Sequence, residues 1–287
     1  MPRPPRDGAR SIVRSSMAAQ QTRADAENKA DALLRAHHAH PQHAPTLARR
    51  IFALLCDEAR QLESSPLTAT LARELVLRHG SFEHAIGSAV ATKLSLPAAV
   101  RDVLIATFCT PLTLGALVAD IAKAWVADPA TTTLIQAIFL LKGFMALAAH
   151  RAAHALWLAG ERTLALLLQS RASEAFAVDI HPAASIGDGI MLDHATGVVI
   201  GATCILGGDT YILHGVTLGA TGKPTRAHKR HPTIGRGCTL GAGSTVLGDV
   251  VVGDHAVVGA SAVVTRDVPT GTTVVGVNQQ RGPRARL

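Results

Sequence analysis

The sequence predicts an α+β protein in which an N-terminal helical domain precedes a parallel β-helix of hexapeptide repeats. Two observations predict the β-helix: an aliphatic residue recurs at every sixth position through the C-terminal half, and glycine often follows it. Each hexapeptide would form one flat side of a coil, with its aliphatic side chain stacked on the equivalents in neighbouring coils. Apolar residues at helical spacing before Val178 predict the helices. The repeat positions, counted from Ile180, are Ile186, Leu192, Val198, Cys204, Thr210 and Val216, and then Ile234, Leu240, Val246, Val252, Val258 and Val264.

The composition agrees with a narrow solenoid. Of 287 residues, 48% are hydrophobic, which is enough for a core, and only 3% are aromatic. The four cysteines show neither metal-ligand spacing nor a disulfide framework, so we expect a reducing compartment and no bound metal. They are Cys56 and Cys109, and also Cys204 and Cys238, which are expected as small residues of the solenoid core.

The net charge of +7 is concentrated at the two ends of the chain. Residues 1–45 carry a net charge of +3 and the last arginines another +3, which leaves +1 for residues 46–280. The body also lacks interleaved basic and aromatic positions, so we expect no nucleic-acid partner. We expect no membrane span, because the longest apolar stretch, Leu134–Ala149, is too short and contains Lys142.

The chain divides into four segments: 1–45, 46–177, 178–277 and 278–287. The first is expected to be a disordered basic extension of a cytoplasmic protein, although its Arg/Ser-rich opening has a faint similarity to an organellar transit peptide. The helical domain should contain a long helix from Thr133 to Ala159 and another from Glu161 to about Ala175. The β-helix is interrupted by a polar loop at 222–232, and a short basic tail ends the chain. Loops that project from a rigid scaffold often carry function.

Polar residues break the repeat at three places: Asp179 to Pro182, Asp193 to Gly197, and Lys229 to Pro232. A coil of three hexapeptides takes about eighteen residues, so positions 179 and 197 should be equivalent on adjacent coils. Asp179 and His194 would then share a corner, where a carboxylate beside an imidazole makes a general base. Arg230 with His231 suits recognition of a small carboxylate.

These residues also have ordinary interpretations. A histidine at a coil corner is usually a surface residue, which we favour for His181 and His214, whereas for His194 the pattern leaves both interpretations open. Arg230 in a basic loop is by default a solvated cation. The stretch Gly219–Lys223 is only superficially similar to a phosphate loop, because no helix follows it. The pattern alone thus predicts a solenoid with a His/Asp corner.

At these clusters the chain resembles the serine O-acetyltransferases, a family of hexapeptide-repeat acyltransferases. The resemblance covers about residues 46–277 and is carried by VDIHPAASIGDGIMLDHATGVVIG (178–201), ILHGVTLGATGK (212–223), KRHPTIG (229–235) and LGAGSTVLG (240–248), with ADPA (127–130), LLKGFMALAAHR (140–151) and HALW (154–157) in the helical part. It implies a left-handed β-helix, a homotrimer with active sites between subunits, and two trimers joined through their helical domains. It also implies transfer of the acetyl group of acetyl-CoA to the hydroxyl of L-serine, which gives O-acetyl-L-serine and CoA in the first step of cysteine biosynthesis.

The resemblance further implies a role for each matching residue. The general base is His194, and Asp179 orients it. Four residues hold the amino acid. Its ammonium group is contacted by Asp128 and Asp193, and its carboxylate is contacted by Arg230 and His231. Acetyl-CoA would lie along the coils beside small residues, namely Gly219, Thr221, Gly222, Ala242 and Ala260. No metal is needed, because the thioester is already activated.

The C-terminal end departs from the family in two ways. Most members have a GVPA-type turn where this chain has Gly276 to Gln280, a change at the far edge of the acetyl-CoA site. Many bacterial members have a tail ending in isoleucine that binds cysteine synthase, whereas this chain has Arg286-Leu287. This difference speaks against cysteine synthase as a partner.

Three alternatives stay open at this point. An acetyltransferase of the same fold could act on another hydroxyl, although Asp128 and the Arg230–His231 pair match both charges of an amino acid. A γ-type carbonic anhydrase, also a trimeric left-handed β-helix, would need His181, His194 and His214 as zinc ligands. A non-catalytic regulatory subunit would leave the cluster at 193–197 unexplained.

Overall fold

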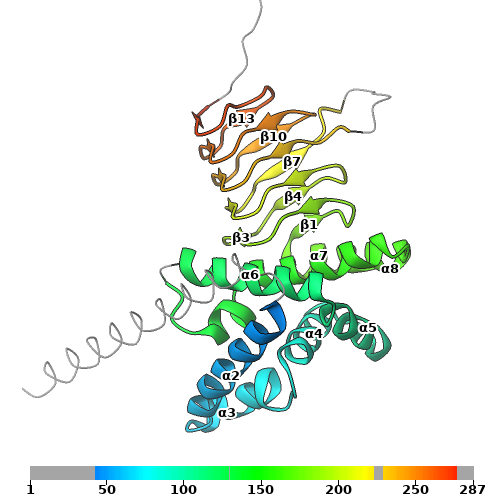
Figure 1. Ribbon diagram of the computed structural model, residues 1–287, viewed down its shortest axis with the longest axis vertical. Coiled ribbons are helices and arrows are strands. Elements are labelled where there is room, and N and C mark those ends of the chain that lie inside the picture. Colours follow the sequence, from blue (N-terminus) through cyan, green and yellow to red (C-terminus); the bar gives the residue numbers. More distant parts are fainter. Residues whose placement is uncertain (1–42, 129, 223–228, 277–287) are drawn as a thin grey trace, which may run out of the picture.

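The computed structural model describes residues 43–128, 130–222 and 229–276, and it consists of a helical domain on which a β-helix stands (Figure 1). The coil that contains β1 lies against the helices, and the coil that contains β13 lies farthest from them. The predicted basic extension before 43, most of the polar loop and the tail lie outside the described residues.

The helices are closely packed around apolar side chains. They are α2 (Ala44–Leu62), α3 (Pro66–Ala72), the π-helical segment η2 (Arg73–Leu77), α4 (Phe82–Lys93), α5 (Ala98–Phe108), α6 (Pro111–Ala127), the π-helical segment η3 (Gln136–Leu140), α7 (Lys142–Leu158) and α8 (Arg162–Phe176). Three of them, α2, α3 and α6, have proline in the first turn, where its missing N–H is not needed. The helix predicted from Glu161 is confirmed as α8, and the change of period near Val178 is confirmed as the start of β1.

The single helix predicted for Thr133–Ala159 is wrong. The chain is extended at Leu141 (φ −85°, ψ 107°), which separates η3 from α7. The break lies beside a long-range contact, because Gly143 in the first turn of α7 is so close to the carbonyl of Leu192 that a Cβ there would collide with it. The break thus lets α7 pack directly on the first coil of the β-helix.

The β-helix consists of three parallel sheets, and successive strands of the chain enter the three sheets in turn. Its strands are β1 (Val178–Ile180), β2 (Ser185–Ile186), β3 (Met191–Leu192), β4 (Val198–Ile200), β5 (Ile205–Leu206), β6 (Tyr211–Ile212), β7 (Thr217–Gly219), β8 (Thr233–Ile234), β9 (Thr239–Leu240), β10 (Thr245–Leu247), β11 (Val251–Val252), β12 (Val257–Val258), β13 (Val263–Val264) and β14 (Thr273–Val274). The sheets have the orders β1-β4-β7-β10-β13, β2-β5-β8-β11 and β3-β6-β9-β12-β14. This arrangement confirms the predicted parallel β-helix.

The register corrects the expected coil length at the start of the solenoid. Asp179 pairs with Val199, twenty positions later, and not with residue 197, whereas Val199 pairs with Thr217, eighteen positions later. Every sixth residue counted from Ile180 therefore no longer marks an equivalent position after the first coil. Ile180 pairs with Ile200, so the counted residues from Val198 to Val216 lie two positions before the equivalents of Ile180. They are buried nonetheless, because residues two apart in a strand face the same side.

A buried ion pair joins the helical domain to the first coil. The guanidinium of Arg151 on α7 donates to both carboxylate oxygens of Asp120 on α6, at 3.0 Å each, and the two side chains are 7% and 1% exposed. Arg151 also donates to the carbonyls of Ile186 and Gly187, and Asp120 accepts the N–H of Ile190 at 2.9 Å. The pair thereby fixes α6 and α7 against the coil that carries the polar turns.

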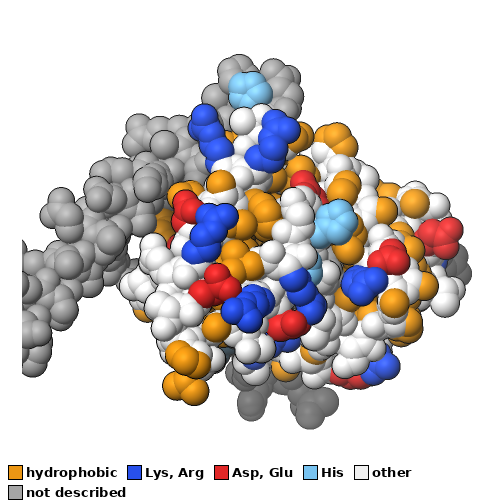
Figure 2. All heavy atoms as spheres, turned by 90° about the horizontal axis from the view of Figure 1, so that it is seen from below, with side chains coloured by type: hydrophobic (Ala, Val, Ile, Leu, Met, Phe, Trp, Pro, Cys, Tyr) orange, Lys and Arg blue, Asp and Glu red, His pale blue; other side chains and the backbone are white. Residues whose placement is uncertain are grey.

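No single helix within the described residues is long and apolar enough to cross a membrane; α5 and α6 pass that test only together, and they are bent by 85°. Seen from the helical end, Lys and Arg side chains alternate with Asp and Glu and with apolar patches (Figure 2). Among the exposed apolar residues of the helices are Leu67, Leu112, Leu140 and Leu158.

Candidate active site

The turn between β3 and β4 projects His194 from the solenoid. Six residues separate Leu192 from Val199, whereas four separate the paired residues Ile212 and Thr217 of the next coil. The two additional residues are accommodated by a left-handed backbone at His194 (φ 55°) and Ala195 (φ 59°). Few residues other than glycine adopt this conformation, and it is concentrated at functional sites. Ala195 is buried, and the His194 side chain is 72% exposed.

Equivalent turns of later coils stack on this one, progressively farther from the helical domain. We call this stack, residues 193–198, 213–216, 241–244 and 259–262, the His194 corner. Backbone hydrogen bonds connect it: Gly215 donates to Thr196, Gly243 to His214 and Ser261 to Ala242, at 2.8–2.9 Å. The predicted acetyl-CoA contacts Ala242 and Ala260 therefore lie in line with His194, on coils farther from the helical domain. The rings of His194 and His214 meet edge to face, with centroids 5.7 Å apart.

A carboxylate of the His194 corner and a second one beside the corner flank a half-buried phenol. The hydroxyl of Tyr211 donates to Asp193 Oδ2 at 2.6 Å, and Asp193 Oδ1 is 3.8 Å from His194 Nε2. Asp128, at the end of α6, is held by the N–H of Ala130 and the hydroxyl of Thr131. Burial raises the pKa of Tyr211, and the charges of Asp193 and Asp128 raise it further, so the phenol remains a hydrogen-bond donor. Two carboxylates around one donor make a site suited to a cation.

A second group of turns holds the predicted carboxylate-binding residues. We call it the Arg230 corner, residues 181–184, 201–204, 220–222 and 229–232. The hydroxyl of Thr203 accepts the backbone N–H groups of Arg230 and His231, at 3.1 and 3.2 Å. The Nδ1 atom of His231 lies 2.8 Å from the same hydroxyl and accepts the N–H of Thr203 at 3.2 Å. Burial lowers the pKa of His231, and Arg230 and Lys229 lower it further. A neutral His231 beside an exposed Arg230 can bind an anion by donating from Nε2.

Asp179 lies on β1, in the sheet that joins the two corners. One of its oxygens, Oδ1, accepts the side-chain amide of Gln169 at 2.6 Å. Its neighbour His181 accepts the N–H of Ala183, and the His181 ring lies edge-on to Trp157 with centroids 5.2 Å apart. Burial lowers the pKa of His181, Asp179 raises it and Arg230 lowers it, which places His181 with the Arg230 corner.

A single chain therefore carries two half-sites. One half-site is the His194 corner with His194, Asp193, Ala242 and Ala260, together with Asp128 beside it. The other is the Arg230 corner with Arg230, His231, Thr221 and Gly222, together with Gly219 at the end of β7, whose carbonyl accepts the N–H of Gly248 at 2.9 Å. Within the described ranges no hydrogen bond or ion pair joins Asp179 to His194, so their pairing stays a prediction. In the same ranges no three His, Cys, Asp or Glu side chains form a group suited to a metal.

Three residues with clear contacts were not predicted from the sequence. Tyr211 holds Asp193, Thr203 holds Arg230 and His231, and Gln169 holds Asp179. The one available signal was that Tyr211 is the single tyrosine of the chain. The other two have no local signature, because their partners come from another coil or from another domain.

Comparison with known proteins decides the family. The model of the family "Serine acetyltransferase, N-terminal" matches residues 51–149, and "Bacterial transferase hexapeptide (six repeats)" matches residues 231–266. A probable serine acetyltransferase of Oryza sativa subsp. japonica is 51% identical over 220 residues, which are 75% of this chain and 69% of the relative. The chain belongs to the serine acetyltransferase family. A serine acetyltransferase of Buchnera aphidicola is 41% identical over 229 residues, 78% of this chain and 83% of the relative.

Solved structures of the family agree over the whole described fold. The Neisseria gonorrhoeae serine acetyltransferase in complex with serine matches with a TM-score of 0.75 at 38% identity, over 80% of this chain and 97% of that one. A serine acetyltransferase in complex with cysteine matches with a TM-score of 0.76, also at 38% identity, over 80% and 97%. Family membership confirms the resemblance found in the sequence, the acyltransferase class and the left-handed β-helix of hexapeptide repeats.

Proposed function

We propose that this protein transfers the acetyl group of acetyl-CoA to the hydroxyl of L-serine, giving O-acetyl-L-serine and CoA for cysteine biosynthesis. The observation that carries the proposal is the charge of the two half-sites. The His194 corner carries two carboxylates next to an exposed imidazole, and the Arg230 corner carries a guanidinium beside a neutral imidazole. These groups complement the ammonium and the carboxylate of a zwitterionic amino acid.

His194 acts as the general base in this proposal. Its Nε2 takes the proton of the serine hydroxyl while the oxygen attacks the thioester carbonyl. The tetrahedral intermediate then collapses, the C–S bond breaks, and the imidazolium returns the proton to the departing sulfur of CoA. Asp193 and Asp128 hold the ammonium group, so that the hydroxyl of a short side chain reaches His194.

The two half-sites come together between copies of the chain. The corners lie at opposite ends of the β1-β4-β7-β10-β13 sheet, so we propose that the Arg230 corner of one subunit faces the His194 corner of the next in a homotrimer. Exposed aliphatic residues on the flat faces, including Val199, Ile205 and Val251, support such packing. The exposed leucines of the helical domain support the pairing of two trimers.

Acetyl-CoA is the second substrate in this proposal, and it lies in the groove between two solenoids. Ala242 and Ala260 place small side chains in line with His194 on later coils, which leaves the backbone open to the ligand. Gly219, Thr221 and Gly222 of the neighbouring subunit contribute from the other side.

The first experiment follows thiol release from acetyl-CoA by wild type and His194→Ala. The acceptors are L-serine, L-homoserine, a galactoside or none. Serine-dependent release that falls by at least about 100-fold in the variant supports both the substrate and the base. Release with another acceptor keeps the chemistry and rejects the substrate, and no release with any acceptor rejects the proposal.

A complementation experiment tests the shared site. His194→Ala and Arg230→Ala chains, each inactive alone, are unfolded, mixed in equal amounts and refolded together. Random assembly places two intact half-sites at about a quarter of the interfaces, so about a quarter of the wild-type activity should return. The matched control mixes His194→Ala with His194→Ala plus Arg230→Ala, which has no intact pair. No recovery in the first mixture rejects a site built from two chains.

A further inference from the structure

Gln169 is the only side chain for which the structure gives a hydrogen bond to Asp179 within the described residues. Its Nε2 lies 2.6 Å from Oδ1. An ionised carboxylate only accepts hydrogen bonds, so the amide must present its NH₂ group to Asp179 and keep its oxygen for another partner. The contact occupies one oxygen of Asp179 and leaves the other available to an imidazole.

The fold holds Gln169 rigidly in front of β1. Helix α8 ends at Phe176, and the left-handed backbone of the next residue, Ala177 (φ 54°), turns the chain directly into β1. Leu168, Ala172 and Phe176 bury the inner face of α8, so the backbone of Gln169 is held in place with the helix. A long side chain fixed at both its backbone and its tip can hold a carboxylate in one orientation.

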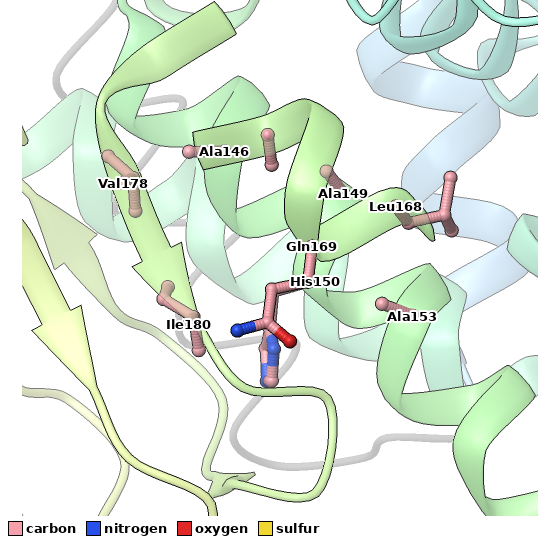
Figure 3. A pocket seen from close by; sticks show the side chains of 9 residues that line it. Ala146, Ala149, His150, Ala153, Leu168, Gln169, Val178 and Ile180 are labelled. Carbon is pink, nitrogen blue, oxygen red and sulfur yellow. The ribbon is translucent and has the colours of Figure 1, made fainter. Parts of the chain in front are cut away.

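Behind Gln169 lies a small cavity with a second polar group (Figure 3). It lies between α7, α8 and β1, with alanines as much of its wall, and the space open to the centre of a water-sized sphere is about 10 Å³. His150 from α7 lies next to Gln169 there, and its Nδ1 is buried without a hydrogen-bond partner. Burial holds the pKa of His150 well below its usual range, and Arg151 lowers it further, so the ring is neutral.

A cavity of this size has room for one water molecule, and a buried polar atom needs a partner. One water in the cavity would give His150 Nδ1 the partner that it lacks, and it would link the ring to the amide of Gln169, which lines the same cavity. The chain of contacts then runs from α7 through the water and Gln169 to Asp179.

We propose that Gln169 is a positioning residue for Asp179, supported from behind by His150 and one bound water. The inference rests on the proposed function together with the role that the family resemblance implies for Asp179, which is to orient His194 as the base. Gln169 touches neither substrate, and it acts by fixing the rotation of the carboxylate. Loss of a hydrogen bond that orients a metal ligand typically lowers activity about 10- to 100-fold, and we expect a loss of the same order for Gln169.

The test compares Gln169→Met, which keeps the shape and removes the donor, with Gln169→Glu and Asp179→Asn. Gln61→Met on the exposed face of α2 is the matched control. We expect Gln169→Met to lower kcat about 10- to 100-fold, with KM for serine and the thermal unfolding midpoint close to those of wild type and of Gln61→Met. In an Asp179→Asn background the same substitution should have little further effect, because the group that it positions is already changed.

The pH dependence of the activity of Gln169→Glu distinguishes a positioning role from a merely structural one. Two carboxylates side by side repel each other, and one of them binds a proton as the pH falls. The activity of this variant relative to wild type should therefore rise between pH 8 and pH 6, whereas the ratio for Gln169→Met should stay constant.

The outcomes separate this inference from the proposed function. If wild type acetylates serine but Gln169→Met is as active as Gln61→Met, or if its loss adds fully to that of Asp179→Asn, the positioning role is rejected and the function stands. If wild type releases no CoA with serine, the proposed function fails, and the role assigned to Gln169 fails with it.

Discussion

Replacing Asp120 by alanine should destabilise the protein more than almost any other single loss of a carboxylate. Its two oxygens accept two hydrogen bonds from Arg151 and one from the N–H of Ile190, and the carboxylate is 1% exposed. Without it, the guanidinium of Arg151 stays buried with the carbonyls of Ile186 and Gly187 as its remaining partners. The N–H of Ile190 loses its acceptor as well.

The size of the effect follows from these contacts. Removal of one partner of a buried ion pair costs about 3–5 kcal/mol, because the other charge is left uncompensated. An orphaned buried N–H costs about 1–3 kcal/mol, and part of that overlaps with the first effect. We expect a loss of about 4–6 kcal/mol in the free energy of unfolding. Asp102→Ala, which removes a carboxylate from an exposed pair with Arg101, should cost less than about 1 kcal/mol.

Urea unfolding followed by circular dichroism measures both variants, at one protomer concentration because assembly adds to stability. A second variant, Asp120→Leu with Arg151→Met, should be more stable than Asp120→Ala, because no charge then remains buried. A loss in Asp120→Ala no larger than that in Asp102→Ala would refute the reasoning. So would a double variant less stable than Asp120→Ala.

Three further predictions concern single residues. Because the pKa of His150 is lowered in the folded state, the unfolded chain binds a proton at this residue first as the pH falls. The free energy of unfolding should therefore fall as the pH drops below about 6.5, by at most about 1.4 kcal/mol per pH unit. Urea midpoints at pH 7.5 and pH 5.5 should differ less for His150→Met than for wild type. Tyr211→Phe removes the donor that holds Asp193, so KM for serine should rise about 5- to 10-fold in steady-state assays while KM for acetyl-CoA stays unchanged. Gly201→Ala places a Cβ against the ring of His231, so the KM for serine should also rise, whereas Gly80→Ala, with open space around it, should match wild type.

The fold could be predicted because the solenoid repeats one local rule many times. Each aliphatic position supports the same conclusion, so an error at one coil does not change the architecture. The helical domain has no such redundancy. The break at Leu141 was missed because no proline marks it and a single glycine, Gly143, is a weak signal; the importance of Gly143 is visible only from its approach to Leu192, a residue in the other domain.

The candidate site could be predicted only where residue type and motif agree. The charged residues of the two half-sites stand in motifs that resemble a family, and each could be named in advance. Tyr211 could not, because its role depends on the register that pairs it with Met191 and so brings it next to Asp193. Gln169 cannot be distinguished in the sequence from other polar residues of the same helix, because its contact with Asp179 depends on the position of β1.

The main error in the repeat count coincides with the turn that carries the candidate base, and there is a physical reason for this. A solenoid that kept eighteen residues in every coil would place a short turn after β3, like the turn in which Gly215 alone adopts positive φ. Two additional residues force His194 and Ala195 into the left-handed region and carry the imidazole out of the stack. Asp209, His255 and Ser261 in other turns share this backbone, but at this corner it projects an imidazole, as the proposed base requires, whereas the shorter turns of the following coils carry small residues such as Ala242 and Ala260. A departure from the repeat is thus itself a signal of the site, provided that register is examined coil by coil.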